Sequence, residues 1–307
     1  MKILLFTHIS DVDGLNNVVL SKQAFKKVEY VLCEASDVDN KIREKIIDFD
    51  LYDYIYVTDL CPTDNMLLFI DASRYKNKFK VFDHHKGALE QLSRNYDFVT
   101  LKIEDDKGLC CGTSLFYEYL VSNNLIKSTD NLNKLVELTR KYDTWEWKKD
   151  NNIDARNLTW LFNACGIDEY LKILEKRVMK NDFSLEESDY EKIEKWKNDF
   201  DLQISTIVKR MKFMSINGYK AGIVSSAYEY RNDIADYIRD RKYDIDFLAI
   251  VFTDKSSVSY RSIKEDVDVN EIAKLYGGKG HVNASSSPIT EKEKKDINKY
   301  FNKDREV

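Results

Sequence analysis

All four histidines of this chain lie in three short polar motifs, and two of these motifs also contain aspartates. The motifs are THISDVDG at residues 7–14, DHH at residues 83–85 and GGKGH at residues 277–281. Imidazole and carboxylate groups together are typical ligands of a hard or borderline divalent cation such as manganese. The motifs therefore predict a metal-dependent hydrolase that acts on phosphate.

The first motif offers one imidazole and two carboxylates, from His8, Asp11 and Asp13. A loop that follows a strand can direct side chains two to five residues apart into one cavity, and Gly14 permits a tight turn there. An aspartate in front of a helix is also a common N-cap, so Asp13 could simply cap the helix that follows. The motif alone leaves both interpretations of Asp13 open.

Further ionisable residues lie where predicted strands and helices end. Asp59 follows an apolar strand, although an aspartate at this position is also common in turns. Asp83, His84 and His85 directly follow another apolar strand, where three ionisable residues are costly to bury unless they are paired or bound to metal. Adjacent histidines point in different directions, so His84 and His85 are expected to do different jobs. Asp143 ends an amphipathic helix, and a nearby cation would offset its unfavourable position against the helix dipole.

The third motif could bind an anion. Gly278 and Gly280 allow the backbone to approach a phosphate closely, and Lys279 adds a positive charge. His281 can donate a hydrogen bond to a phosphate oxygen, and Arg261, on a predicted strand, could reach the same ligand. A glycine-rich turn that ends a helix and an exposed strand arginine are equally ordinary explanations.

The first half of the chain alternates apolar strands with helices, which predicts a mainly parallel sheet covered by helices on both faces. We expect strands at residues 2–7, 29–33, 54–58, 79–82 and 97–102, and helices at residues 16–27 and 65–75. Ligands of such sheets bind outside the carboxyl ends of the strands. The motifs at His8, Asp59 and Asp83 each begin where a predicted strand stops, so we expect them to meet in space.

The second half is predicted to contain a helical region and then a smaller α/β domain. Residues 111–163 and 168–214 are expected to be helical, and the clearest helix is at 131–142. In the smaller domain we expect strands at 219–225, 246–253 and 257–262, and helices at 233–239 and 270–276. The predicted domains are a metal-binding catalytic domain at 1–165, a helical connector at 166–216 and a substrate-binding domain at 217–307.

Composition narrows the class of protein. The 307 residues suffice for two domains, and the net charge of −5 argues against a broad duplex-binding surface while leaving room for a local phosphate pocket. Five cysteines without CxxC spacing favour reduced thiols over a disulfide framework or a zinc knuckle. We find no signal-peptide pattern, and the longest apolar runs are too short to cross a bilayer. These features predict a cytoplasmic protein.

In their order and spacing, the motifs resemble those of the DHH phosphoesterase superfamily over nearly the whole chain. Residues 7–14 are similar to its N-terminal metal motif, Asp59 to the second motif, residues 83–85 to the name-giving triplet and Asp143 to the fourth motif. The spacing within the first motif is shorter than in some branches of the superfamily.

Residues 277–285 resemble the GGGH signature of the DHH-associated domain of subfamily 1, with Lys279 in place of the third glycine. The chain is most similar to the oligoribonuclease and phosphoadenosine-phosphatase branch. We therefore expect none of the extra domains of RecJ-type DNA exonucleases or of membrane-bound cyclic-di-AMP phosphodiesterases.

The resemblance implies a site for two Mn²⁺ ions, with Mg²⁺ or Co²⁺ as substitutes. His8 and Asp11 would hold one ion, Asp13, His84 and Asp143 the other, and Asp59 would bridge the two. Two such ions offset charge on a phosphate and activate a water molecule for in-line attack.

The remaining motif residues would position the substrate and the histidines. Asp83 would orient a histidine, and His85 would contact the scissile phosphate, so we predict these two as catalytic residues. The phosphate would also be bound from the second domain, by His281, Arg261, Gly278, Lys279 and Gly280.

The implied activity is exonucleolytic hydrolysis of short single-stranded RNA or DNA oligonucleotides, including nanoRNA and dinucleotides, to mononucleotides. A further candidate substrate is 3′-phosphoadenosine 5′-phosphate. Three alternatives are a cyclic or linear dinucleotide (c-di-AMP or pApA) phosphodiesterase, a family II inorganic pyrophosphatase, and an inactive nucleotide-binding protein. The GGKGH segment argues against the pyrophosphatase, and the six candidate ligands argue against the inactive protein.

The sequence does not determine the preferred substrate, the polarity of digestion or whether the chain forms a homodimer. No residue is assigned to stack a base, because aromatic residues such as Tyr228 and Tyr230 are more typical of a core.

Overall fold

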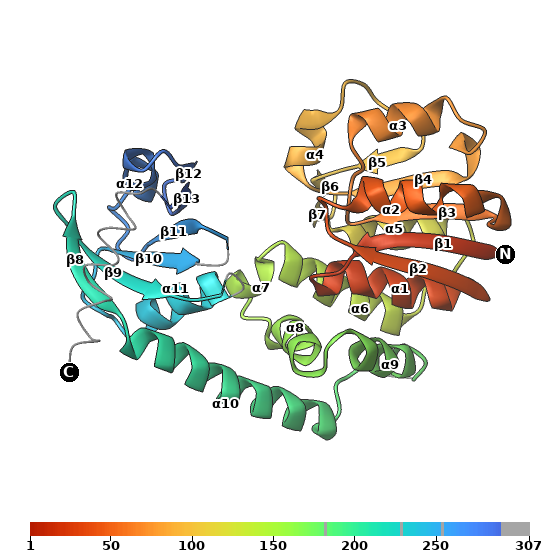
Figure 1. The fold of residues 1–307 in the computed structure, drawn as a ribbon. Helices are drawn as coiled ribbons and strands as arrows, with labels where there is room; N and C mark the ends of the chain where they lie inside the picture. The colour runs from red at the N-terminus through yellow and green to blue at the C-terminus, as the bar shows by residue number, and fades with distance from the viewer. Residues whose placement is uncertain (181–182, 228–229, 253–254, 290–307) are drawn as a thin grey trace. The chain divides into compact units, whose positions relative to one another are not determined.

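The computed structural model describes residues 1–180, 183–227, 230–252 and 255–289. The chain divides into two compact units, Met1–Lys197 and Asn198–Val307. Each unit contains its own sheet with helices packed on it (Figure 1). The predicted α/β class, with a parallel sheet in the first half and a smaller α/β unit after it, is confirmed.

The sheet of unit 1 has five strands in the order β2-β1-β3-β4-β5, and every neighbouring pair is parallel. The strands are β1 (Lys2–His8), β2 (Lys27–Cys33), β3 (Tyr54–Thr58), β4 (Phe79–Asp83) and β5 (Val99–Leu101). Side chains of β1 alternate between the two faces, so that Leu5 belongs to one hydrophobic cluster and Phe6 to the other. This two-sided burial explains why β1 is an almost continuous apolar run.

Helices cover both faces of this sheet (Figure 1). One face packs against α1 (Val12–Ala24) and α5 (Gly112–Ser122). Helices α6 (Asp130–Asp143), α8 (Ile153–Cys165) and α9 (Ile167–Val178) pack on these two helices and on one another, within the same hydrophobic cluster. The other face packs against α2 (Val38–Lys45), the 3-10 helix η1 (Ile46–Leu51) and α3 (Asp64–Asp71). The remaining short elements of unit 1 are η2 (Lys76–Lys78), α4 (Lys86–Gln91), the hairpin β6 (Glu104–Asp105) and β7 (Gly108–Leu109), and α7 (Glu146–Lys149).

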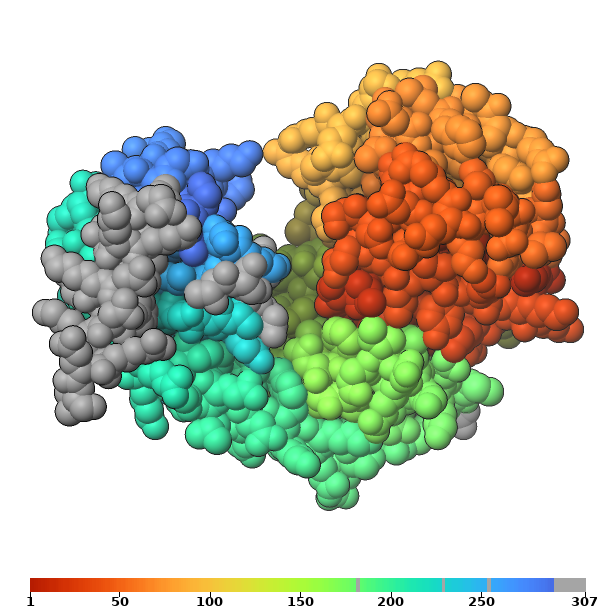
Figure 2. All heavy atoms as spheres, viewed as in Figure 1, coloured from red at the N-terminus to blue at the C-terminus, as the bar shows by residue number. Residues whose placement is uncertain are grey.

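Segments that are distant in sequence thus form one body. Figure 2 shows the red N-terminal segments, the orange segments that follow them and the green helices side by side on the surface of unit 1.

Helix α1 begins earlier than the sequence pattern predicted. We expected a helix over residues 16–27, but α1 runs from Val12 to Ala24. The reason is a local cap: the side chain of Asp11 accepts a hydrogen bond from the backbone N–H of Gly14 at 2.9 Å. Gly14 therefore lies in the first turn of the helix rather than in a loop in front of it.

Unit 2 contains a mixed six-stranded sheet in the order β12-β13-β11-β10-β9-β8. Its strands are β8 (Lys212–Ile216), β9 (Tyr219–Ser225), β10 (Phe247–Phe252), β11 (Ser257–Ser262), β12 (Lys279–His281) and β13 (Ala284–Pro288). Within the sheet, β9 and β10 are parallel and the other pairs are antiparallel. One face packs against α11 (Arg231–Asp240) and the last turns of α10 (Glu187–Lys209), and the other against α12 (Val269–Leu275).

Two predictions for this half were wrong in detail. The charged helical pattern was extended to residue 214, but Lys212–Ile216 is strand β8, which pairs with β9. The GGKGH segment was expected as a loop, but Lys279–His281 is the edge strand β12. The predicted strand over 246–253 is β10, and residue 253 lies outside the described residues.

The predicted connector, residues 166–216, contains α9, α10 and β8. Leu171 and Leu174 of α9 are buried in the core of unit 1, and β8 belongs to the second sheet. The three-part domain division itself stays a prediction. Among the described helices, none combines the length and apolar character that a membrane span requires.

Candidate metal centre

The predicted motifs at His8, Asp59 and Asp83 meet at the carboxyl edge of the parallel sheet. Strands β1, β3 and β4 are neighbours in register, and they end at His8, Thr58 and Asp83. Asp59 directly follows β3, and His84 and His85 directly follow β4. Parallel strands that end side by side place these side chains at one edge, as expected for an α/β sheet.

Asp59 lies at the centre of this edge in a strained backbone conformation. The residue is 1% exposed, and its φ of 57° lies in the left-handed region. Its backbone N–H donates to the carbonyl oxygen of Phe82 at 2.8 Å. Helix α5 begins directly against it, since a Cβ built on Gly112 would lie 2.6 Å from the Cβ of Asp59. Strain of this kind persists where the surroundings fix it and is often found at functional sites.

His8 and Asp11 form the first group with Asp59. The Nδ1 atom of His8 lies 2.6 Å from Asp11 Oδ2 and 3.4 Å from Asp59 Oδ2. Burial alone would lower the pKa of His8, but the hydrogen bond to Asp11 and the nearby charges of Asp11 and Asp59 together raise it to about 11. Burial opposes ionisation of Asp11 too, yet the bond to His8 holds the pKa of Asp11 below its usual value. The protonated imidazole of His8 therefore places a positive charge between the carboxylates of Asp11 and Asp59.

The structure answers the question whether Asp13 caps the following helix. Asp11 caps α1, and Asp13 lies inside that helix with 1% exposure. The carboxylate of Asp13 instead accepts hydrogen bonds from the backbone N–H groups of Gly112 (2.6 Å) and Thr113 (2.7 Å), at the N-terminus of α5. Its Oδ2 atom also lies 3.8 Å from His84 Nε2. Asp13 therefore joins α5 to the centre and still faces the other candidate ligands.

His84 connects the remaining carboxylates. Its Nε2 atom lies 3.4 Å from Asp59 Oδ1 and 3.4 Å from Asp143 Oδ2, at the end of α6. Burial first, and then the charge of Asp13, raise the pKa of Asp143 to about 7. Burial, followed by the same charge, raises the pKa of Asp59 well above its usual value. Burial and mutual repulsion therefore make it unfavourable for these carboxylates to be ionised at the same time.

Two buried polar atoms of this cluster have no hydrogen-bond partner: Asp59 Oδ2 and His84 Nε2. The described residues contain eight buried side-chain atoms of this kind, and these two are the ones that lie within the cluster of candidate ligands. Each unpartnered buried atom costs desolvation energy. Three groups of side chains have potential ligand atoms within 4.8 Å of one another: His8, Asp11 and Asp59; Asp13, His84 and Asp143; and Asp59, Asp83, His84 and His85. A divalent cation would satisfy the orphaned atoms and lower the repulsion between the carboxylates, so the residues present fit a metal ion.

Asp83 and His85 form a pair at the edge of this cluster. Asp83 is 1% exposed and accepts hydrogen bonds from His85 Nδ1 at 2.8 Å and from the backbone N–H of His84 at 2.9 Å. The hydrogen bond between the side chains of His85 and Asp83 is the largest factor that raises the pKa of His85. The imidazole of His85 is 56% exposed, whereas that of His84 is 15% exposed. The two adjacent histidines thus lie in different environments.

Glu34, a neighbour of the cluster, was not predicted from the sequence. Glu34 Oε2 lies 3.2 Å from His8 Nε2, and Ser10 donates a hydrogen bond to the same carboxylate. Glu34 directly follows β2, the strand beside β1. The position at a strand end was the available signal, but the glutamate lies in no motif with a histidine.

The candidate phosphate ligands of unit 2 have a different character. His281 and Lys279 are exposed on β12. A Cβ on Gly278 would lie 2.2 Å from the carbonyl oxygen of Ser286, so packing against β13 already requires that glycine. Arg261 donates hydrogen bonds to Asn232 Oδ1 and to Ser259 Oγ.

The sequence analysis left the aromatic residues Tyr228 and Tyr230 without a role. Tyr228 lies outside the described residues. Tyr230 packs edge-on against Phe200 and donates to Gln203 Oε1. This environment agrees with a role in packing.

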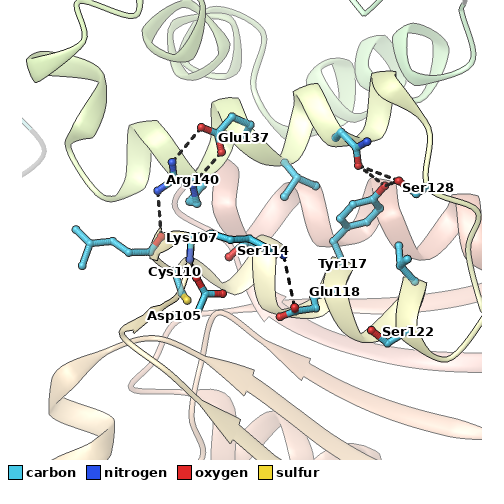
Figure 3. Close-up of a pocket in the computed structure, with 14 residues that line it drawn as sticks. Asp105, Lys107, Cys110, Ser114, Tyr117, Glu118, Ser122, Ser128, Glu137 and Arg140 are labelled. Carbon is cyan, nitrogen blue, oxygen red and sulfur yellow. Dashed lines mark hydrogen bonds and ion pairs between the residues drawn. The ribbon is translucent and has the colours of Figure 1, made fainter.

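A cavity of about 470 Å³ lies between α5, α6 and the β6–β7 hairpin (Figure 3). None of the predicted metal ligands lines it. Its polar groups satisfy one another: Arg140 pairs with Glu137, and the hydroxyl group of Tyr117 donates to Asn133 Oδ1. The cavity therefore shows no group that requires a ligand.

With its motif order, its parallel sheet and its clustered candidate ligands, the chain resembles the hydrolases of the DHH phosphoesterase superfamily. It is similar to oligoribonuclease NrnB of Bacillus subtilis (strain 168), with 29% identity over 293 residues that cover 94% of this chain and 73% of that protein. No protein-family model matches the chain.

Solved structures share the fold. The pGpG-specific phosphodiesterase PggH of Vibrio cholerae superposes with a TM-score of 0.56 at 16% identity, over 97% of each chain. An uncharacterized protein from Helicobacter pylori G27 superposes with a TM-score of 0.50 at 21% identity, over 98% of this chain and 99% of that one. At these identities the likeness concerns the fold.

Proposed function

We propose that this chain is a manganese-dependent phosphodiesterase that hydrolyses short oligonucleotides, such as nanoRNA and dinucleotides, to mononucleotides. The observation that carries the proposal is the pair of unpartnered buried atoms, Asp59 Oδ2 and His84 Nε2, within a cluster of histidines and carboxylates. The relatives named oligoribonuclease and pGpG-specific phosphodiesterase supply the substrate class. We propose a cytoplasmic location, in line with five free cysteines.

Two groups of neighbouring side chains support the proposed ligand sets. His8 and Asp11 would hold one Mn²⁺ ion, Asp13, His84 and Asp143 would hold the second, and Asp59 would contact both. Asp59 suits this role because its Oδ2 faces His8 and its Oδ1 faces His84. When bound, the two ions would supply electrostatic stabilisation of the phosphate and an activated water.

His85 and Asp83 would act on the scissile phosphate. Asp83 holds the Nδ1–H of His85, so the Nε2 atom of the exposed imidazole is left to face a substrate. The raised pKa of His85 favours the protonated ring, which can donate a hydrogen bond to a phosphate oxygen and a proton to the leaving oxygen. In unit 2, His281, Arg261 and Lys279 would bind a phosphate of the substrate, with Gly278 and Gly280 allowing close approach of the backbone.

The test uses the purified full chain with Mn²⁺ and a set of labelled substrates. These are RNA and DNA oligomers of graded length, linear pApA, cyclic-di-AMP, 3′-phosphoadenosine 5′-phosphate and pyrophosphate. We expect mononucleotides to be released fastest from dinucleotides and the shortest RNA oligomers, and chelation of the metal to stop the reaction. Preferred hydrolysis of pyrophosphate, or Mn²⁺ binding without turnover of any phosphodiester, would overturn the proposal.

A further inference from the structure

An exposed tryptophan lies beside the candidate metal centre. Trp145 follows the candidate ligand Asp143 by two residues, so chain geometry keeps their Cα atoms within about 7 Å of each other. Trp145 is 53% exposed. We propose that Trp145 forms a nucleobase-binding subsite in which its indole ring stacks on one base of the substrate. This inference rests on the proposed function and names the part of that site that would hold the base.

The backbone of Trp145 is strained although its side chain belongs to neither hydrophobic cluster of unit 1. Its φ of 64° lies in the left-handed region, which is unfavourable for a bulky side chain. Of the described residues with positive φ that are not glycine, most are asparagine or aspartate, which tolerate this region better. Trp145 belongs to neither hydrophobic cluster of unit 1, whereas Trp147 packs against one of them. Packing therefore does not explain why a tryptophan stands at this position.

The strained conformation is held firmly from both sides. The N–H of Trp145 donates to the carbonyl oxygen of Tyr142 at 3.1 Å, and its own carbonyl oxygen accepts from the N–H of Lys148 at 3.2 Å. Tyr142 and Trp147 stack with their ring centroids 5.7 Å apart. Next to them, Glu146 pairs with Arg140 at 3.0 Å. The segment thus fixes where the indole ring is presented, which lowers the entropy cost of binding a flat ligand.

The chemistry around the ring suits a nucleotide. Lys148 Nζ lies over the Trp145 ring, 4.5 Å from its centroid, so a positive charge already contacts the aromatic surface. Aromatic rings stack on bases with little regard to base identity, and a neighbouring cation favours the phosphates that join them. A short oligonucleotide whose scissile phosphate is bound at Asp143 and Asp59 would bring one of its bases within reach of the Trp145 ring.

The test compares Trp145→Ala and Trp145→Phe with the unchanged enzyme. Alanine keeps a Cβ and therefore keeps the backbone restraint, while phenylalanine restores an aromatic ring. The substrates are pApA and two abasic analogues, each lacking the base on one of its two sugars. Phe69→Ala is the matched control, because Phe69 is 54% exposed in the same unit but follows no candidate ligand.

We expect Trp145→Ala to raise KM for pApA roughly tenfold, within the range of measured base-stacking contributions, with little change in kcat. Trp145→Phe should recover most of the affinity, and Phe69→Ala should behave as the unchanged enzyme. For the analogue that lacks the stacked base, the unchanged enzyme and Trp145→Ala should have the same KM. An equal loss on both analogues, or a lower manganese content of the variant, would show a structural role instead. Unchanged KM on every substrate would overturn the subsite and leave Trp145 for another partner, such as a protein.

A binding measurement separates this inference from the proposed function. If the unchanged protein does not hydrolyse pApA, the proposed function fails, and titration with AMP or pApA still tests the subsite. Quenching of tryptophan fluorescence in the unchanged protein but not in Trp145→Phe would support stacking at this residue. Equal quenching in both proteins, or none in either, would contradict it.

Discussion

The metal cluster of unit 1 and the glycine-rich segment of unit 2 differ in how far the protein satisfies their polar groups. In the cluster, Asp59 Oδ2 and His84 Nε2 are buried without hydrogen-bond partners, and Asp59 has a strained backbone. In the segment, the close contact of Gly278 with β13 explains the glycine, and the side chain of Arg261 already has acceptors within its own unit. The first region contains buried atoms that a cation would satisfy, and none of the buried unpartnered atoms of the described residues lies in the second.

This difference separates two kinds of inference. Buried charges and orphaned atoms raise the free energy of the bare protein, so the structure of unit 1 alone argues for a cation. The exposed side chain of His281 adds little to the free energy of the folded protein, whether or not a ligand is bound. Phosphate binding by His281 is therefore inferred from the motif, and only an experiment with substrate can test it. Variants of the two regions should therefore fail in different ways.

The largest effect is expected for Asp59→Asn. Asparagine keeps the shape of the side chain and tolerates a φ of 57°, but it removes the charge that would contact both ions. Electrostatic stabilisation by the metal contributes several kcal/mol, so we expect kcat to fall about a thousandfold or more. Burial raises the pKa of Asp59 well above its usual value, so removal of the charge should not lower the Tm of the metal-free protein. Turnover of pApA, metal analysis and thermal unfolding measure these three quantities.

Asp97→Asn is the matched control for this variant, because the carboxylate of Asp97 is 92% exposed in the same unit. It should keep both the activity and the manganese content. An Asp59→Asn variant that still binds two ions and retains a tenth of the activity would remove Asp59 from the metal centre.

A smaller effect, confined to the substrate, is expected for His281→Ala. A hydrogen bond to a charged group contributes about 1.5–3 kcal/mol, so kcat/KM should fall roughly 10- to 100-fold. Manganese content should not change, which is the contrast with Asp59→Asn. The control is Lys274→Ala, which removes an exposed cation from the neighbouring helix α12. An equal loss in both variants would indicate general electrostatic attraction rather than a specific contact with His281.

The sequence was most informative where apolar runs end at polar residues. The predicted strands at Tyr54–Thr58, Tyr219–Ser225 and Ser257–Ser262 agree with β3, β9 and β11 residue for residue. The first two are short, largely apolar runs, and Ser257–Ser262 alternates polar residues with Val258 and Tyr260. The ends of such strands in the first half gave His8, Asp59 and Asp83, which the fold does bring together.

Features that depend on distant contacts could not be predicted. Asp13 accepts hydrogen bonds from residues about a hundred positions away, at the start of α5. Strand β8 follows a long charged helix without a glycine or proline between them, and its pairing with β9 fixes its conformation. The exposure and the backbone strain of Trp145 depend on how residues 142–145 fold, and the sequence YDTW predicts neither of them.

The smallest expected effect concerns stability, and it tests whether the strain in the cluster belongs to a metal site. Burial and the charge of Asp13 raise the pKa of Asp143 to about 7, so the folded chain retains a proton that the unfolded chain releases near pH 4. The contribution of Asp143 therefore favours folding at low pH and is lost as the pH rises from about 4 to about 7. A cation needs the ionised carboxylate, so stabilisation by Mn²⁺ should grow over the same interval.

Thermal unfolding with and without Mn²⁺ at several pH values measures this competition. Ligand at about a hundred times its Kd stabilises by roughly 3 kcal/mol, so we expect Mn²⁺ to raise Tm by several degrees near pH 7.5 and by little near pH 5. In Asp143→Asn, the rise near pH 7.5 should be much smaller, because a ligand is lost. A rise in Tm that is the same at every pH, or that survives in Asp143→Asn, would mean that the ion binds elsewhere. The unpartnered atoms of Asp59 and His84 would then need another explanation.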